Sequence, residues 1–104
     1  MVWCATSLVI VRDVTGPDRD ALIRQLRNEG LDVTEWQDEP GASYPEHAHA
    51  TREVRVVVDG SMTITTGDRT VELGPGDRID LAPNEPHSAV VGPAGCTYLA
   101  GTDR

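Results

Sequence analysis

The sequence predicts an all-β fold, a barrel or sandwich of short strands, with one short helix near the N-terminus. Short runs of alternating and β-branched residues recur along the chain, and such runs are typical of strands. Turn signals separate them, as in Asp59-Gly60, Gly67-Asp68 and Gly92-Pro93. Because these signals recur at short intervals, they favour a barrel or sandwich over a parallel sheet with crossover helices.

Eight segments have the composition expected of strands. They are Cys4–Val11, Leu31–Gln37, Glu53–Val58, Met62–Thr66, Arg69–Leu73, Arg78–Leu81, Ser88–Val91 and Cys96–Ala100. One segment has helical periodicity instead. Pro17-Asp18 opens it, Ala21, Leu22 and Leu26 supply an apolar face, and Gly30 ends it. We expect this amphipathic helix to pack outside the barrel as a cap.

Length and charge limit the possible functions. At 104 residues the chain has room for one domain with one modest core. Seventeen acidic residues against nine basic ones give a net charge of −8, and the sequence has no basic stripe, so we expect no nucleic-acid partner. All the basic residues are arginine, which excludes a Schiff-base mechanism or a lysine general base.

The sequence also predicts a cytoplasmic protein without a membrane partner. No apolar run approaches the roughly 20 residues that a membrane-spanning helix needs. The N-terminus lacks the basic flank of a signal peptide and meets a charge at Arg12. Cys4 and Cys96 lie far apart without metal-binding spacing, and we expect them to be buried and reduced rather than paired as a terminal staple.

Three histidines and a glutamate have spacings suited to metal binding. His47 and His49 are two residues apart, so on an extended chain both imidazoles project from the same face. Glu53 can return to the point where they converge, and His87 can supply a third imidazole from a later strand. This donor set suits one divalent Fe, Mn, Ni, Co, Cu or Zn ion, but lacks the oxygens for Ca²⁺ and the thiolates for structural zinc. Taken alone, the spacing also fits a polar strand edge.

The same residues resemble the first motif of the cupin superfamily. Gly41, five residues, His47, one residue, His49, three residues, Glu53, six residues and Gly60 match that motif throughout. The segment 76–87 resembles the second motif, with His87 at the matching distance from Gly76. The departures are Ala82 in place of the usual proline, Asn84 in place of the usual glycine, and Val91 in place of the usual asparagine. Asparagine tolerates the left-handed turn that glycine provides.

The resemblance covers residues 38–100 and implies a double-stranded β-helix, the cupin or jelly-roll barrel, with residues 1–104 as a single cupin domain. In this interpretation the N-terminal strand and helix occupy residues 1–37. The resemblance further implies that His47, His49, Glu53 and His87 point inward as metal ligands. It also implies a homodimer, made by exchange of the N-terminal strand 4–11.

Arg55 is the next candidate site residue. Strand alternation places it on the same face as Glu53, and a buried guanidinium near a metal is costly without an anionic partner. We therefore expect Arg55 to clamp a substrate carboxylate or enolate, although an internal ion pair with Asp80 or Glu72 fits equally. The Glu53-Val54-Arg55 order resembles a strand of acireductone dioxygenases, which are longer metal cupins.

Aromatic residues near the expected barrel mouth are candidates for substrate binding. Trp36 and Tyr44 could pack against a substrate ring, but core cover is the expected role for Trp36. Tyr44 is better placed, three residues before His47. Tyr98 and Cys96 could face the lumen or the outside, according to the register of the last strand.

The sequence favours a small metal-dependent enzyme, dioxygenase-like, acting on an anionic small molecule that chelates the metal through oxygen. Glu53 could also leave the metal and act as a base, and Arg55 would assist. A non-catalytic ligand-binding cupin and a metal-dependent isomerase or lyase remain alternatives, because a fold does not determine a function.

Overall fold

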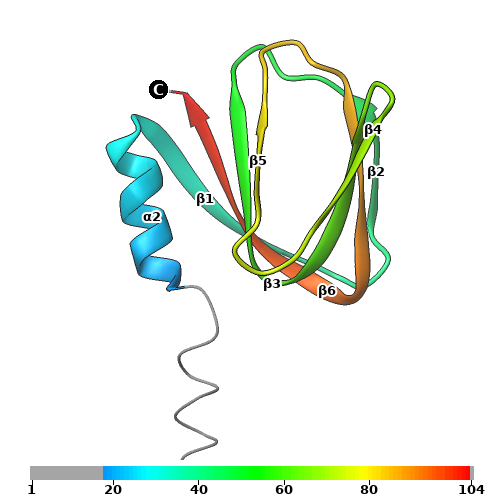
Figure 1. The fold of residues 1–104 in the computed structure, drawn as a ribbon, viewed down its shortest axis with the longest axis horizontal. Coiled ribbons are helices and arrows are strands. Elements are labelled where there is room, and N and C mark those ends of the chain that lie inside the picture. The colour runs from blue at the N-terminus through cyan, green and yellow to red at the C-terminus, as the bar shows by residue number, and fades with distance from the viewer. Residues whose placement is uncertain (1–17, 104) are drawn as a thin grey trace, which may run out of the picture.

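The computed structural model describes residues 18–103, which form one helix and six strands (Figure 1). The elements in chain order are α2 (Arg19–Asn28), β1 (Leu31–Asp38), β2 (Ser43–His47), β3 (Glu53–Thr66), β4 (Arg69–Leu73), β5 (Arg78–Leu81) and β6 (His87–Asp103). The predicted all-β barrel with one short helix is confirmed. The predicted strand Cys4–Val11 lies outside the described residues.

The two longest strands, β3 and β6, pair with each other and run through both walls of the barrel. In one wall, β1 pairs with the C-terminal half of β6 and β5 pairs with the N-terminal half of β3. In the other wall, β2 pairs with the N-terminal half of β6 and β4 pairs with the C-terminal half of β3. All these pairings are antiparallel, which is the arrangement of a jelly roll.

A bend joins the two halves of β3 where the sequence predicted a turn. Register shifts interrupt its pairing with β6 between Val57 and Asp59 and between Gly60 and Met62. Gly60 has φ +77°, and a Cβ there would lie 2.1 Å from the carbonyl oxygen of Gly95. The predicted strands 53–58 and 62–66 are therefore one bulged strand. For the same reason the predicted strands 88–91 and 96–100 both belong to β6.

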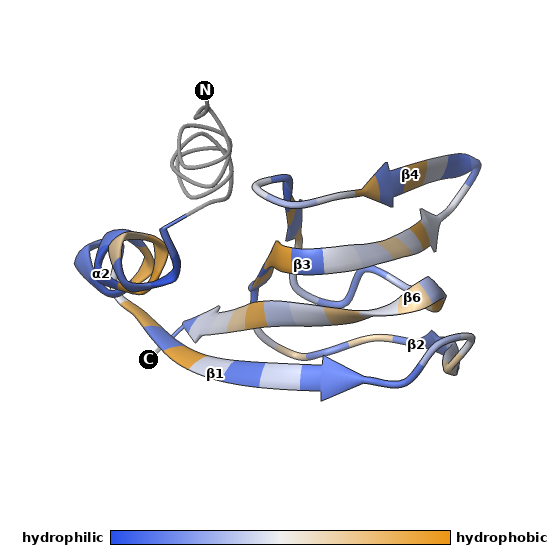
Figure 2. Ribbon diagram, turned by 90° about the horizontal axis from the view of Figure 1, so that it is seen from below, coloured by the Kyte–Doolittle hydropathy of each residue, from blue (hydrophilic) through white to orange (hydrophobic). Residues whose placement is uncertain are grey.

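The helix covers the outside of the barrel, as predicted. Asp18 caps its N-terminus by accepting a hydrogen bond from the Ala21 amide at 3.1 Å, and Gly30 follows its end with φ +89°. Leu26 is 1% exposed and packs in a small cluster with Leu31, Val54, Val56 and Leu99. Figure 2 shows the helix end-on, with its apolar side toward the strands.

Alternation along β3 separates this outer cluster from the barrel interior. Val54 and Val56 face the helix, whereas Val57 belongs to the interior core. That core consists of Val57, Met62, Ile64, Leu73, Ile79, Leu81, Ala89, Val91, Cys96 and Tyr98. Cys96 is buried with a free thiol, as expected, while Cys4 lies outside the described residues.

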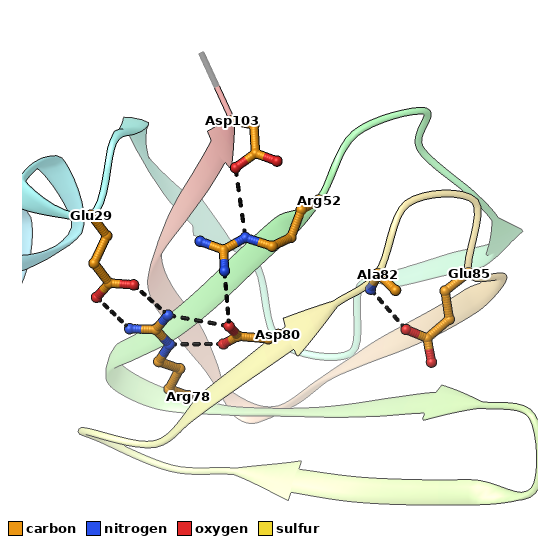
Figure 3. Close-up of polar contacts among 7 residues, drawn as sticks. All are labelled: Glu29, Arg52, Arg78, Asp80, Ala82, Glu85 and Asp103. Atoms are coloured by element: carbon orange, nitrogen blue, oxygen red, sulfur yellow. Dashed lines mark hydrogen bonds and ion pairs between the residues drawn. The ribbon is translucent and has the colours of Figure 1, made fainter.

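A chain of ion pairs ties the end of the helix to the strands (Figure 3). Both terminal nitrogens of Arg78 lie 2.8 Å from the oxygens of Glu29, and its Nε lies 2.8 Å from Oδ1 of Asp80. Arg52 continues the chain at 3.6 Å to both Asp80 and Asp103. Arg78 lowers the pKa of Glu29 and of Asp80 by hydrogen bonding. Within residues 18–103, no helix has the length and apolar character to cross a membrane.

Candidate metal centre

Three imidazoles meet at the open end of the barrel. His47 is the last residue of β2, His87 is the first residue of β6, and the two are paired in register. His49 follows β2 after one residue. One ring nitrogen from each histidine lies within 4.8 Å of the others, and the ring centroids are 4.4 to 5.3 Å apart. The sequence did not predict β2 as a strand, because Pro45 and polar residues dominate this segment.

Backbone carbonyls orient two of the rings. Nδ1 of His47 lies 2.8 Å from the carbonyl oxygen of Pro45, and Nδ1 of His87 lies 3.0 Å from that of Glu85. If each Nδ1–H donates to its carbonyl, each Nε2 keeps its lone pair for a ligand. Nε2 of His87 and Nε2 of His49 are buried and have no hydrogen-bond partner. Unpartnered nitrogens that converge in this way fit a bound metal ion.

Burial also keeps His87 in the protonation state that a metal requires. The residue is 1% exposed, and desolvation is the main cause that lowers the pKa of its imidazole. A neutral imidazole is the form that coordinates a metal.

Glu53, at the start of β3, lies beside the histidines. Its side chain is 9% exposed, and its Oε2 lies 3.3 Å from Nε2 of His49, an ion-pair distance without hydrogen-bond geometry. Its Oε1 accepts a hydrogen bond from Nε of Arg55 at 2.8 Å and forms an ion pair with Nη2 of Arg55, also at 2.8 Å. The structure thus brings the carboxylate next to the three-histidine cluster and fixes one of its oxygens.

Arg55 shares the inward face of β3 with Glu53, as strand parity predicted. The expected alternative partners, Asp80 and Glu72, are not its partners: Asp80 pairs with Arg78 and Arg52, and Glu72 is exposed. The expected ion pair of Arg55 with Asp80 or Glu72 is therefore wrong, because Asp80 and Glu72 lie on the faces of their strands that point away from the lumen. The internal acid that Arg55 contacts is Glu53.

The site opens into a cavity of about 250 Å³. Its lining comprises Trp36, Tyr44, His47, His49, Glu53, Arg55, Tyr98 and Ala100. Trp36 is 51% exposed, so its expected role as core cover is wrong. It lies on β1, which has only one paired neighbour among the described strands, and an edge strand leaves its inner face partly open. Tyr44 is half-buried in the cavity wall, where the sequence placed it.

Two further cavity residues are Tyr98, whose orientation the sequence left open, and Ala100, which the sequence did not single out. Tyr98 pairs in register with Val57, and Ala100 with Arg55, so both face inward. Burial raises the pKa of the Tyr98 hydroxyl, and the neighbouring carboxylate of Asp38 raises the pKa of Tyr44. Both phenols therefore stay protonated at neutral pH. In the sequence, strand alternation places Tyr98 on the same face as Cys96. It does not show which face points inward, because the register of the last strand is not known from the sequence.

The donor set can hold one divalent transition metal ion. Three imidazole nitrogens with an adjacent carboxylate suit Fe, Mn, Ni, Co, Cu or Zn. Ligands supplied from one side would leave coordination positions open toward the cavity.

Comparison with known proteins places this chain among proteins of the same architecture. The family model described as a cupin domain matches residues 34–98. A cupin-2 domain containing protein from Shewanella frigidimarina has 21% identity and a TM-score of 0.62, with 72% of each chain covered. Among curated proteins, no sequence matches this chain.

Two enzymes also have structures similar to this chain. The polyketide cyclase RemF from Streptomyces resistomycificus has 36% identity and a TM-score of 0.61, and the match covers 69% of this chain and 53% of the cyclase. An oxalate decarboxylase variant from Bacillus subtilis has 25% identity and a TM-score of 0.66, with 78% of this chain and 23% of the decarboxylase covered.

Proposed function

Because the chain belongs to the cupin domain family, we propose that it is a metal-dependent enzyme acting on an anionic small molecule that binds the metal through oxygen. His47, His49 and His87 hold the ion, and Glu53 is the fourth ligand through Oε2. The observation that carries this proposal is the convergence of three imidazoles, two of them with buried and unpartnered Nε2 atoms. A purely structural role for these histidines would leave that desolvation without compensation.

The bound ion would act as a Lewis acid on the substrate oxygen. Arg55 holds Oε1 of Glu53, which keeps the carboxylate at the edge of the cavity and balances its charge. Glu53 is then placed to accept a proton from a substrate bound beside it. Trp36, Tyr44 and Tyr98 line the space that the substrate would occupy.

We favour proton-transfer chemistry of the isomerase or lyase type over oxygen chemistry. The support is the placement of Glu53 beside the cavity, together with the names of the similar enzymes, a cyclase and a decarboxylase. A dioxygenase is the second candidate, because the Glu53-Val54-Arg55 order resembles acireductone dioxygenases and because open coordination positions would admit dioxygen. A non-catalytic cupin that only binds its ligand is the third.

Elemental analysis of protein purified without added metal tests the metal site. We expect about one equivalent of a transition metal in the wild type, and loss of most of it in His49→Ala and in His87→Ala. Glu46→Gln is the matched control, since Glu46 is exposed and adjacent to His47 but is absent from the cavity lining. Full metal content in either histidine variant would contradict the assignment.

The metal found also separates the candidate reactions. Zinc or manganese, with turnover that does not consume dioxygen, would support proton-transfer chemistry. Iron, copper or nickel, with dioxygen uptake that depends on substrate, would support the dioxygenase. An oxygen electrode and elemental analysis on the same preparation decide between them.

A further inference from the structure

The guanidinium of Arg55 has an unpartnered nitrogen inside the protein. The side chain is 9% exposed, and its Nη1 atom is buried without a hydrogen-bond partner. A buried charged donor without a partner is strongly disfavoured, so such an atom at a cavity wall points to a ligand. Arg78 shows the contrast, because its Nε and both terminal nitrogens have carboxylate partners.

The contacts of Arg55 show which part of the group is free. Oε1 of Glu53 accepts a hydrogen bond from Nε and forms an ion pair with Nη2, so the edge of the guanidinium that carries these two nitrogens is occupied. The end that carries Nη1 is not, and Arg55 is part of the cavity lining. A planar fork of this kind binds carboxylates through parallel N–H donors.

Charge at the loaded site favours an anion at that end. Arg55 and Glu53 neutralise each other, and neutral imidazoles add no charge, so a divalent ion would leave these groups with a net charge of about +2, or about +1 when the partly buried carboxylate of Asp38 beside Tyr44 and Tyr98 is included. The chain as a whole carries −8. Attraction of an anion is therefore a property of this cavity and not of the protein surface.

One wall of the cavity is aromatic, and its Tyr98 ring lies beside Arg55, whose guanidinium carbon is 5.6 Å from the ring centroid. Trp36 on β1 and Tyr98 on β6 are directly paired in register, so their side chains lie next to each other on the inward face. Tyr44 completes this wall from β2. Tyr98 is 4% exposed and part of the core, whereas Trp36 is 51% exposed. A large exposed indole at a cavity mouth offers a flat surface for a ring.

We propose that the cavity binds a planar aromatic or conjugated carboxylate, with its carboxylate on the free end of Arg55 and its ring along Trp36. This inference rests on the proposed function for the charge of the loaded site, and it narrows the substrate to a chemical class. Another oxygen of the same molecule would then face the three-histidine centre.

Binding of simple acids to the zinc-loaded protein tests the proposal. Benzoate and cyclohexanecarboxylate have similar size and charge, but only benzoate is planar. Calorimetry should give a roughly three- to tenfold lower Kd for benzoate, the range expected for an aromatic contact. Trp3→Phe leaves Trp36 as the one tryptophan, and benzoate should then change its fluorescence. Equal affinity for the two acids would overturn the aromatic part of the proposal.

Substitution of Arg55 tests the carboxylate contact. Arg55→Lys should weaken benzoate binding roughly thirtyfold, because lysine cannot reproduce the fork. Arg52→Lys is the matched control, since Arg52 pairs with Asp80 and Asp103 outside the cavity, and its Kd should not change. An unchanged Kd in Arg55→Lys would overturn the proposal, whether or not that variant is less stable.

A metal-free variant separates this inference from the proposed metal site. In Glu53→Gln treated with a chelator, Arg55 has lost its internal counter-ion, so benzoate should bind more tightly than to the metal-free wild type. That result supports the Arg55 site even if elemental analysis finds no metal in the wild type. No gain in affinity in Glu53→Gln would overturn the Arg55 site even if the histidines do hold a metal.

Discussion

Replacing His87 by leucine should cost the metal-free protein little stability. In the wild type, Nε2 of His87 is buried without a partner, and leaving such a group unsatisfied costs about 1–3 kcal/mol. The His87→Leu substitution would remove that penalty but would also lose the contact between Nδ1 and the Glu85 carbonyl, which contributes about 1 kcal/mol. The two effects partly offset each other, so we expect the free energy of unfolding to be unchanged or to rise by up to about 2 kcal/mol. Truncation of a well-packed core residue would cost about 2–5 kcal/mol.

Added zinc should reveal what His87 contributes. At a free zinc concentration of about 100 times Kd, binding to the native state stabilises the wild type by about 2.7 kcal/mol. His87→Leu should lose most of this gain. Urea unfolding followed by circular dichroism, with chelator and with zinc, measures both quantities for each protein.

Thr66→Val is the matched control for this experiment. Thr66 is also buried, but its hydroxyl has partners: it donates to Oε2 of Glu85 at 2.8 Å and lies 2.9 Å from the Pro86 carbonyl. Its loss should destabilise the protein by about 1–3 kcal/mol with and without zinc, and the zinc gain should remain. A loss above about 3 kcal/mol in chelator-treated His87→Leu, or an undiminished zinc gain, would refute the reasoning.

Three further predictions concern stability and assembly. Because Arg78 lowers the pKa values of Glu29 and Asp80, its stabilisation is present above their unfolded pKa values near 4 and is lost as the pH falls through the lower folded values. Arg78→Gln should therefore be less stable at pH 7 and lose less stability between pH 6 and pH 3 in urea titrations; equal pH profiles would contradict this. Gly60→Ala should cost about 3 kcal/mol or more, because its φ is positive and the new Cβ would meet the Gly95 carbonyl; a melting temperature within about 2 °C of the wild type would be the contrary result. The full chain should be a homodimer, and light scattering at micromolar concentration that gives the monomer mass would exclude it.

Local chemistry made several elements predictable. Asp18 is a residue type that commonly caps the N-terminus of a helix, and Gly30 is one that commonly follows its C-terminus. The helix lies between them. Asn84 was expected to take a left-handed turn, and it has φ 64°. Turn signals near Gly60 and Gly92 were recognised, but whether a glycine ends a strand or bends it depends on the partner strand. That information is not local, so β3 and β6 were each divided into two predicted strands.

The sequence predicted those site residues whose positions follow from strand alternation or from motif spacing. Strand parity placed Arg55 with Glu53, and the motif spacing led to the three histidines that converge. The exposure of Trp36 depends on β1 lying at an edge of the described sheet, which composition does not reveal. The unpartnered end of Arg55 could not be predicted either, because it follows from how Glu53 occupies the rest of the group.

The bend of β3 at Gly60 sets the distance between the two ends of the strand. Glu53 begins the strand in one wall, and Thr66 ends it in the other, next to His87. Each arm from Gly60 is about six or seven residues, or roughly 20 Å at about 3.3 Å per residue. A change of about 5° at the bend would therefore move Glu53 relative to His87 by roughly 2 Å, the difference between coordination and no contact. A metal ion bound by Glu53 and His87 would fix this angle. Metal binding would then reduce the mobility of the bend at Gly60, far from the metal site.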